Sequence, residues 1–376
     1  MNVYNLTAHN STDKQCYCVI WRLEPSGSQP TKCRTCIRLD LTPTEENINK
    51  KQLHLEEVNL RRTLYVQDAE NEDSETKIYS ADLQKVFLLP RMPKVKDSFF
   101  TSRLVAFNET FAVKGKSKKS PHYCILRHEG KAGRRADDVA CSFIKFIQLQ
   151  RDAESLIIWM DNFTGQNKNW VLYSALIVYI NSEYCTTKNI TLKYLLTGHT
   201  YMAADGLHGK IEQYVKKVGN VEDFNDFAEA CNKAVSRNKV ICLEISDFMK
   251  FENVCKSATG SAKKKSVGDD VSFLKDIVEV RFIKGQQEFF YKTDFRDEQY
   301  KETKNLIKRK TELNIPKPLT TVRGVSPKKK DDIMKALVPA MKPSKRLFWE
   351  NLPTNLMFQI YWKKVSYAYI WTKDFV

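Results

Sequence analysis

Residues 155–170 read SLIIWMDNFTGQNKNW, and this stretch decides the fold class. Its first part, Leu156 to Met160, is an unbroken apolar run, which is typical of a short strand buried on both faces. The run ends at Asp161, and a turn containing Gly165 leads into a helical apolar pattern from Trp170 to Ile180. A carboxylate at the carboxyl end of a buried strand is a common ligand position in open α/β sheets. The alternative is that Asp161 only caps the turn or the helix.

The composition indicates a globular chain with a large positive charge. Of the 376 residues, 42% are hydrophobic and 28% are charged, and the formal net charge is +16. A chain of this length holds one large domain or two ordinary ones. The charge favours a polyanionic partner, and nucleic acid is the usual one. Charge alone does not distinguish DNA from RNA, or either from an acidic membrane surface.

No targeting or membrane segment is evident in the sequence. The N-terminus, MNVYNLTAHNSTDK, lacks a signal-peptide pattern, and no apolar run approaches the ~20 residues of a membrane span. We therefore expect a protein that is neither secreted nor inserted in a membrane, with the nucleus favoured and the cytosol as the alternative. The ten cysteines are then expected to be thiols or metal ligands, because the cell interior is reducing.

Three residues near the N-terminus form a partial set of zinc ligands. Cys33 and Cys36 are a C-x-x-C pair, and His54 follows on a predicted helix. Tetrahedral zinc takes four soft or borderline ligands, and Cys16 or Cys18 could supply the fourth. The alternative is that these cysteines are unligated thiols.

The central part of the chain has a regular order of elements. The predicted order is three strands, then a helix, a strand, a helix, a strand and a helix, at Ile78–Leu89, Phe99–Val113, His122–Glu129, Asp137–Leu149, Leu156–Met160, Trp170–Ile180, Ile190–Leu196 and Ala203–Lys217. A meander of three strands followed by alternating helices and strands is the order of the ribonuclease H fold. The predicted fold class is therefore α/β and ribonuclease H-like.

Changes in composition divide the chain into five predicted parts. They are an N-terminal segment with the Cys/His residues at 1–75, the ribonuclease H-like core at 76–255, a linker at 256–270, a small basic C-terminal unit at 271–353 and an unassigned aromatic tail at 354–376. Within the small unit we predict a hairpin across Gly285 and a helix that begins at Ser326 and Pro327.

Three carboxylates are expected at one edge of this fold. Asp82 lies on the first strand, Asp161 ends the fourth, and Asp205 opens the helix after the fifth. Because the first and fourth strands are neighbours in a ribonuclease H sheet, these acids should converge and bind Mg²⁺ or Mn²⁺. Two such ions can support cleavage or transfer of a phosphodiester. The alternative is that three of the 45 acidic residues fall near strand ends by chance.

Several polar residues near these acids are predicted to support a phosphate-handling site. They are Asn162, Gln166, Asn167, Lys168, His199, His208 and Glu212. The amides and Lys168 could contact phosphate oxygens, and the histidines could act as ligands or as acid–base groups. A lone histidine is more often a structural hydrogen-bonding residue. Glu212 lies one helical turn after His208 and is an alternative third acid.

Lysine clusters account for much of the surplus charge and are predicted to contact nucleic acid. They include Lys116, Lys118, Lys119, Lys263, Lys264, Lys265, Lys328, Lys329 and Lys330. Such runs usually lie on solvated loops or helix faces, but several of them in one basic chain are compatible with a track for a phosphate backbone. The cluster at residues 263–265 is also compatible with a nuclear import signal.

Three longer motifs carry a family resemblance. They are SADLQKV with LP at 80–86 and 89–90, DNFTGQNKN at 161–169 and GHTYMAADGLH at 198–208, and RGVS at 323–326 accompanies them. Together they resemble a transposase-derived family that is widespread in animal genomes, especially those of insects, over roughly residues 33–353. The resemblance implies an integrase-like ribonuclease H core with Asp82, Asp161 and Asp205 as metal ligands, DNA as the partner, and a Cys/His cluster before the core.

This chain departs from the family pattern in two places. A Lys/Ser-rich loop lies between Phe111 and Tyr123, and no recognisable DNA-binding module precedes residue 30. Two hypotheses therefore stand. The chain is a metal-dependent nuclease or strand transferase, or it is a domesticated, catalytically inactive nucleic-acid-binding protein that keeps the fold. Either one is compatible with a homo-oligomer.

Overall fold

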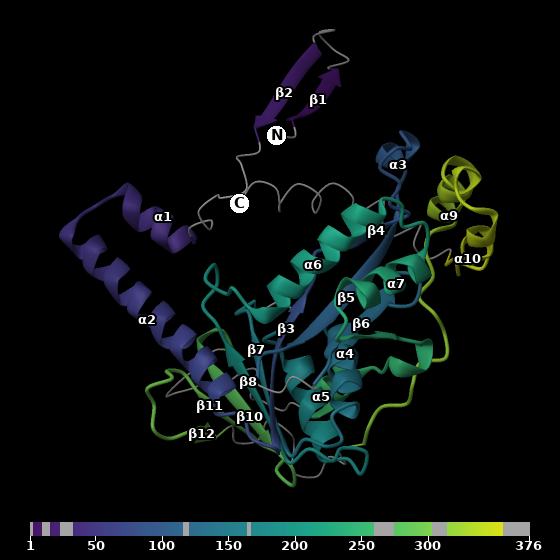
Figure 1. The fold of residues 1–376 in the computed structure, drawn as a ribbon. Helices are drawn as coiled ribbons and strands as arrows, with labels where there is room; N and C mark the ends of the chain where they lie inside the picture. The colour runs from purple at the N-terminus through teal and green to yellow at the C-terminus, as the bar shows by residue number, and fades with distance from the viewer. Residues whose placement is uncertain are drawn as a thin grey trace. The chain divides into compact units, whose positions relative to one another are not determined.

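The computed structural model (Figure 1) describes most of the 376-residue chain, namely residues 3–9, 16–22, 33–115, 120–163, 167–258, 274–302 and 314–355. The chain divides into two compact units, Met1–Glu56 and Glu57–Val376, and the boundary falls inside a long helix. Among the described residues, no helix is both long and apolar enough to span a membrane.

The first unit contains a hairpin and two helices. Strands β1 (Val3–His9) and β2 (Cys16–Arg22) pair in antiparallel register. Helix α1 (Arg34–Leu41) begins after Cys33, whose Sγ accepts a hydrogen bond from the Cys36 N–H at 3.2 Å. The long helix α2 (Glu45–Glu70) carries two acidic residues in its first turn, where they stabilise the helix dipole.

A mixed sheet organises the second unit (Figure 1). An antiparallel meander of β3 (Thr76–Leu83), β5 (Leu104–Val113) and β6 (His122–His128) is followed by β7 (Ser155–Met160) and β8 (Asn189–Tyr194), which run parallel to β3. The order across the sheet is β12-β11-β10-β8-β7-β3-β5-β6-β9. The α/β class is confirmed, and β7 is buried as its uniform apolar run predicted.

The first predicted strand ends earlier than expected, and the second begins later. The segment predicted as one strand over 78–89 divides into β3 and β4 (Phe87–Leu89), and both of these pair with β5. Residues Asp97–Phe100 form the short helix α3 instead of the start of β5. The local pattern did not reveal either break, because both segments keep an apolar composition.

Helices cover both faces of the sheet. Helices α4 (Ala136–Gln148) and α5 (Trp170–Ile180) pack in one core, and α6 (Ala203–Val218) and α7 (Phe224–Ala234) pack in another. Helix α5 is buried over nearly its whole length because α8 (Phe251–Ala258) and strand β10 cover the sides that the sheet does not.

The predicted separate unit at 271–353 is not observed. The predicted hairpin is present as β10 (Glu279–Ile283) and β11 (Phe289–Lys292), but β10 pairs with β8 and continues the main sheet, and β12 (Lys301–Glu302) follows. The physical reason is that the apolar side of this hairpin, including Val280, is buried in the same core as α5. Most of the predicted linker and of the predicted tail lies outside the described residues.

The end of the described chain packs on the α7 side of the sheet. Helix α9 (Pro327–Ala336) begins as predicted, with Ser326 Oγ accepting a hydrogen bond from the Lys329 N–H at 3.2 Å. Helix α10 (Arg346–Glu350) inserts Trp349, whose Nε1 donates to the Glu222 carbonyl at 3.2 Å. On the same side, β9 (Asn238–Cys242) pairs parallel to β6.

The pairing of β8 with β10 can be tested by a double-mutant cycle. Val280 and Leu192 are directly opposed, so Val280→Ala and Leu192→Ala should interact by about 0.5–1 kcal/mol in the free energy of unfolding. Urea unfolding followed by circular dichroism measures this interaction. Leu192→Ala combined with Ile333→Ala is the control, because Ile333 lies in the other core, and this pair should be additive. Additivity of Leu192 with Val280 would contradict the pairing.

Candidate functional site

Asp82 lies near the end of the central strand β3, opposite Thr110 of β5. Its side chain shares a face of the strand with Ser80, because alternate residues point to the same side. The Ser80 Oγ accepts a hydrogen bond from the Ala204 N–H at 3.0 Å, which fixes the first turn of α6 against β3. The start of α6 therefore lies over the strand that carries Asp82.

This packing creates a compact cluster of possible metal ligands. One ligand atom from each of Asp82, Asp205 and His208 lies within 4.8 Å of the other two. The Asp205 Oδ2 accepts a hydrogen bond from the Met202 N–H at 2.7 Å, which holds this carboxylate at the first turn of α6. The His208 Nδ1 is 3.7 Å from the Asp82 Oδ2, and its Nε2 is buried with no partner in the described part of the chain.

The protonation states of this cluster suit a cation. Burial lowers the pKa of His208 to about 4, so the imidazole is neutral at pH 7, which is the form that binds metals. Burial, together with the charges of Asp161, Glu109 and Asp205, raises the pKa of Asp82 to about 8. A divalent cation would relieve the repulsion among these carboxylates, so the donor set fits a hard metal ion.

Asp161 follows β7, the strand beside β3, and the paired residues Ala81 and Met160 directly precede the two acids. The Asp161 Oδ1 accepts hydrogen bonds from the Asn167 Nδ2 and, at 3.4 Å, from the Phe163 N–H. Asp161 does not cap α5, because Asn169 does so by accepting from the Leu172 N–H at 2.8 Å. Asp161 is outside the 4.8 Å cluster, but its charge contributes to the raised pKa of Asp82.

Sequence reasoning missed one acid in this region, Glu109 of β5. Its side chain is fully buried, and burial raises its pKa to about 7 while Arg127 opposes this shift. Neither carboxylate oxygen has a hydrogen-bond partner among the described residues. The signal in the sequence was a charged residue inside an otherwise buried strand, FNETFAV at 107–113.

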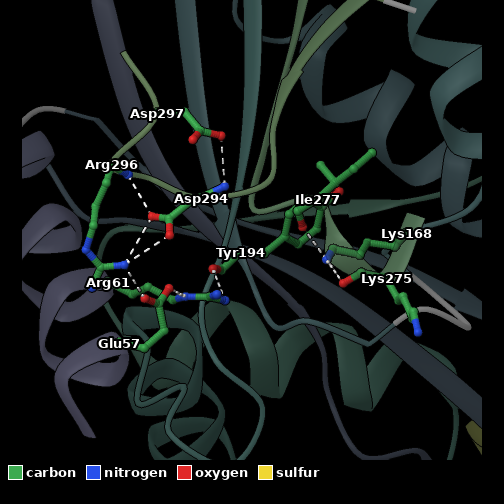
Figure 2. Close-up of polar contacts among 9 residues, drawn as sticks. All are labelled: Glu57, Arg61, Lys168, Tyr194, Lys275, Ile277, Asp294, Arg296 and Asp297. Atoms are coloured by element: carbon green, nitrogen blue, oxygen red, sulfur yellow. Dashed lines mark hydrogen bonds and ion pairs between the residues drawn. The ribbon is translucent and has the colours of Figure 1, made fainter. Parts of the chain in front are cut away.

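Lys168 does not have the predicted position. Its side chain is buried, and its Nζ donates to the backbone carbonyls of Lys275, at 3.1 Å, and Ile277 (Figure 2). The Nζ also lies 4.5 Å from the centre of the Tyr194 ring, and burial lowers the pKa of the lysine to about 7. The predicted contact of Lys168 with phosphate is therefore wrong in this structure, because the amine faces the protein interior and fastens the segment before β10.

The other predicted supporting residues have varied positions. Asn167 is buried and orients Asp161, and the Oδ1 of Asn162 is buried without a partner in the described chain. His199 lies in the turn after β8, where its N–H donates to the Leu196 carbonyl at 3.0 Å. Glu212 is exposed on α6 and is not a member of the acid cluster. Gln166 lies outside the described residues.

Of the predicted lysine clusters, only the last lies in the described chain. Lys328 pairs with Asp332 at 2.6 Å and Lys329 pairs with Glu129 at 2.6 Å. Lys330 donates to backbone carbonyls after α10. These three amines have partners within the protein, although the side chain of Lys328 remains exposed, so the predicted contact of this cluster with nucleic acid stays a prediction. The clusters with Lys116, Lys118 and Lys119 and with Lys263, Lys264 and Lys265 lie outside the described residues.

The first unit contains a separate Cys/His cluster that could hold a metal. Ligand atoms of Cys33, Cys36 and His54 lie within 4.8 Å of one another, and the Cys33 Sγ is 3.2 Å from the His54 Nε2. Burial raises the pKa of Cys36 to about 11, and the hydrogen bond to Cys33 adds to this shift. A bound cation would instead favour the thiolate, so this apolar position of two thiols and an imidazole is suited to a soft or borderline ion.

Comparison with known protein families gives a match in the middle of the chain. Residues 141–279 are similar to a domain of unknown function (DUF7869). The matched part contains Asp161, Asp205 and His208, and Asp82 precedes it. No curated protein and no solved structure matches the sequence.

The raised pKa of Asp82 predicts a stability change with a definite sign. Between about pH 4 and pH 8 the folded protein holds a proton on Asp82 that the unfolded chain has lost, so this residue makes stability fall as the pH rises. Asp82→Asn removes the effect and should raise the free energy of unfolding more at pH 8 than at pH 5, by up to about 4 kcal/mol, because each pH unit in this window contributes about 1.4 kcal/mol.

Urea unfolding without divalent cations, at several pH values, measures this difference. Glu212→Gln is the matched control, because Glu212 is exposed on α6 outside the cluster. An Asp82→Asn protein that is destabilised equally at both pH values would contradict the crowded, buried environment of this acid.

Proposed function

We propose that this chain is a divalent-metal-dependent DNA nuclease or strand transferase with a ribonuclease H-like core. The observation that carries the proposal is the cluster of Asp82, Asp205 and His208, with Asp161 at the end of the neighbouring strand. The order β6-β5-β3-β7-β8, with an antiparallel meander and two parallel additions, supports the fold assignment. The motif resemblance to transposase-derived proteins supports the choice of reaction.

The residues would have distinct roles in this reaction. Asp82, Asp161 and Asp205 would hold Mg²⁺ or Mn²⁺, and His208 is placed to assist them. The bound ions would activate the attacking water or 3′ hydroxyl and stabilise the leaving oxygen. Asn167 orients the carboxylate of Asp161, and the Met202 N–H orients that of Asp205. These contacts set the acids in place before the substrate arrives.

The charge of the chain supports nucleic acid as the substrate. A formal net charge of +16 attracts a polyanion and favours association at low salt. DNA follows from the family resemblance, and the nucleus is the corresponding location. A catalytically inactive DNA-binding protein is the alternative outcome of the test below.

Nicking of supercoiled plasmid DNA with Mn²⁺ tests the proposed activity. Asp82→Asn and Asp161→Asn should each lower the nicking rate by on the order of 100-fold or more, because each removes a carboxylate from the metal site. Glu212→Gln should nick at the wild-type rate. Undiminished nicking by Asp161→Asn would exclude this residue from the active site. Calorimetric titration with Mn²⁺ that shows no dependence on Asp82 would favour the inactive alternative.

We also propose that the Cys/His cluster of the first unit binds a structural zinc ion, which the proximity of Cys33, Cys36 and His54 supports. Cys36→Ser should abolish the zinc that copurifies with the protein and lower the melting temperature, because structural zinc contributes directly to folding. Elemental analysis and thermal unfolding measure both effects. Cys242→Ser is the control, since Cys242 lies on β9. Unchanged zinc content in Cys36→Ser would contradict the proposal.

A further inference from the structure

The short helix α3 exposes two aromatic rings at one point of the surface. Phe99 is 82% exposed and Phe100 is 79% exposed, more than any other large apolar side chain in the described part of the chain. Their ring centres are 6.3 Å apart, and the planes are tilted by 58°. Exposed apolar side chains that gather in this way mark an interaction site.

The base of α3 is firmly packed, so the rings are presented in a defined position. Met92 and Ser98 are buried, and the Thr101 N–H donates to the Asp97 carbonyl at 3.0 Å. Arg91 exchanges two backbone hydrogen bonds with Val221, at 2.8 and 3.0 Å. These contacts hold α3 on the chain that connects α6 to α7.

The segment that carries the two rings is positively charged. Residues 91–103 contain four basic side chains and one acidic side chain, which gives this segment a net charge of +3. Lys94 and Lys96 are exposed and have no ion pair with any described acid. Exposed aromatic rings beside unpaired cations are the combination that binds single-stranded nucleic acid, since bases stack on the rings while phosphates meet the cations.

Exposed glycines and lysines form a basic stripe along α6, and this stripe runs from the acid cluster toward α3. The residues of this stripe are exposed, recur at helical spacing and are Gly206, Gly209, Lys210, Gln213, Lys216 and Lys217, and the exposed acid Glu212 lies at its edge, one turn before Lys216. A Cβ at either glycine would meet nothing within 4 Å, so packing within the protein does not require glycine there. Glycine is a poor helix former, and its use at open positions allows close approach of another molecule. The three lysines have no ion pair with described acids.

The length of α6 accounts for part of the distance between the acids and the rings. Asp205 lies in its first turn, and the Arg91 Nη1 donates to the Gly219 carbonyl just after its last residue. Figure 1 shows α6 running from the region of β3 to the region of β4 and α3. The 14 residues from Asp205 to Gly219 span about 21 Å, which corresponds to about six nucleotides of a stacked strand.

We infer that a DNA strand lies along the stripe of α6 and that Phe99 and Phe100 stack on an unpaired base about six or more nucleotides from the phosphate at the acid cluster. The identity of that phosphate as the scissile one rests on the proposed function, whereas the binding does not. The preferred substrate is therefore DNA that is frayed, branched or single-stranded near the cleavage site. Recognition is independent of sequence, because every base offers a face for stacking.

Fluorescence anisotropy with labelled DNA and EDTA tests the inference in the full-length protein without cleavage. One probe is a duplex that carries a run of unpaired thymidines, and the other is fully paired. The wild type should bind the first more tightly. The double variant Phe99→Ala with Phe100→Ala should lose about tenfold in affinity for the first probe and keep its affinity for the second. Lys216→Gln with Lys217→Gln should weaken binding to both probes and reduce the dependence on salt.

Leu347→Ala is the matched control, because Leu347 is an exposed apolar residue, 64% accessible, on α10. Equal binding of both probes by the wild type, or unchanged binding by the phenylalanine variant, would overturn the inference. A phenylalanine variant that changes only from dimer to monomer in light scattering would also overturn it, since the rings would then contact protein.

The same experiments separate this inference from the proposed function. Phenylalanine-dependent binding in a wild type that does not nick plasmid DNA would reject the nuclease and leave the DNA surface standing. Nicking that requires Asp82, together with binding that is independent of the phenylalanines, would reject only the inferred surface.

Discussion

The constraint on which the rest of the structure depends is the repulsion among carboxylates gathered at the end of β3. Asp82 is surrounded by the charges of Asp161, Glu109 and Asp205 in a region where burial already disfavours a negative charge. Like charges in such a place separate or take up protons unless the surrounding structure holds them together. His208 adds no positive charge to compensate, because burial keeps it neutral. The cluster therefore persists because Asp82 keeps a proton up to about pH 8 and the scaffold fixes each acid from its own strand or helix.

That scaffold works through a few long-range polar contacts in addition to the two cores. The Tyr65 hydroxyl accepts a hydrogen bond from the Ala203 N–H at 3.0 Å, which joins the second half of α2 to the start of α6. Earlier in α2, Arg61 pairs with Glu57 and donates to the Tyr194 carbonyl, and Glu57 also pairs with Arg296 at 2.9 Å (Figure 2). These contacts tie the helix to the end of β8 and to the segment after β11. The elements that carry the acids cannot separate without breaking them.

The features that the sequence revealed are those encoded in short windows. The uniform apolar run of β7 and the acids at strand and helix ends could be read locally, and the structure brings Asp82, Asp205 and His208 together. The burial of Lys168 could not be read in this way, because its partners are carbonyls more than a hundred residues later. A lysine beside an acid has the same local pattern whether it faces solvent or the core.

The sequence did not reveal the pairing of β10 with β8, for the same reason. A hairpin with one apolar face has the same sequence pattern whether it forms a small unit or extends a distant sheet. Only the three-dimensional requirement to cover α5 distinguishes the two arrangements. Glu109 is a different case, because a charge within a buried strand is visible in the sequence. The sequence did not show that β5 is covered on both faces, so the burial of this acid was not predicted.

Helix α6 combines the requirements of stability and of function along one element. Its buried side carries Leu207, Ile211 and Val215 into the core, and its first two turns carry Asp205 and His208 into the acid cluster. Its exposed side has two open glycines, where alanine would make a more stable helix. A helix selected only for stability would not keep them. The loss is tolerable because the helix is fixed at its first turn by Ser80 and beyond its last turn by Arg91, so its stability comes from tertiary contacts more than from its own propensity.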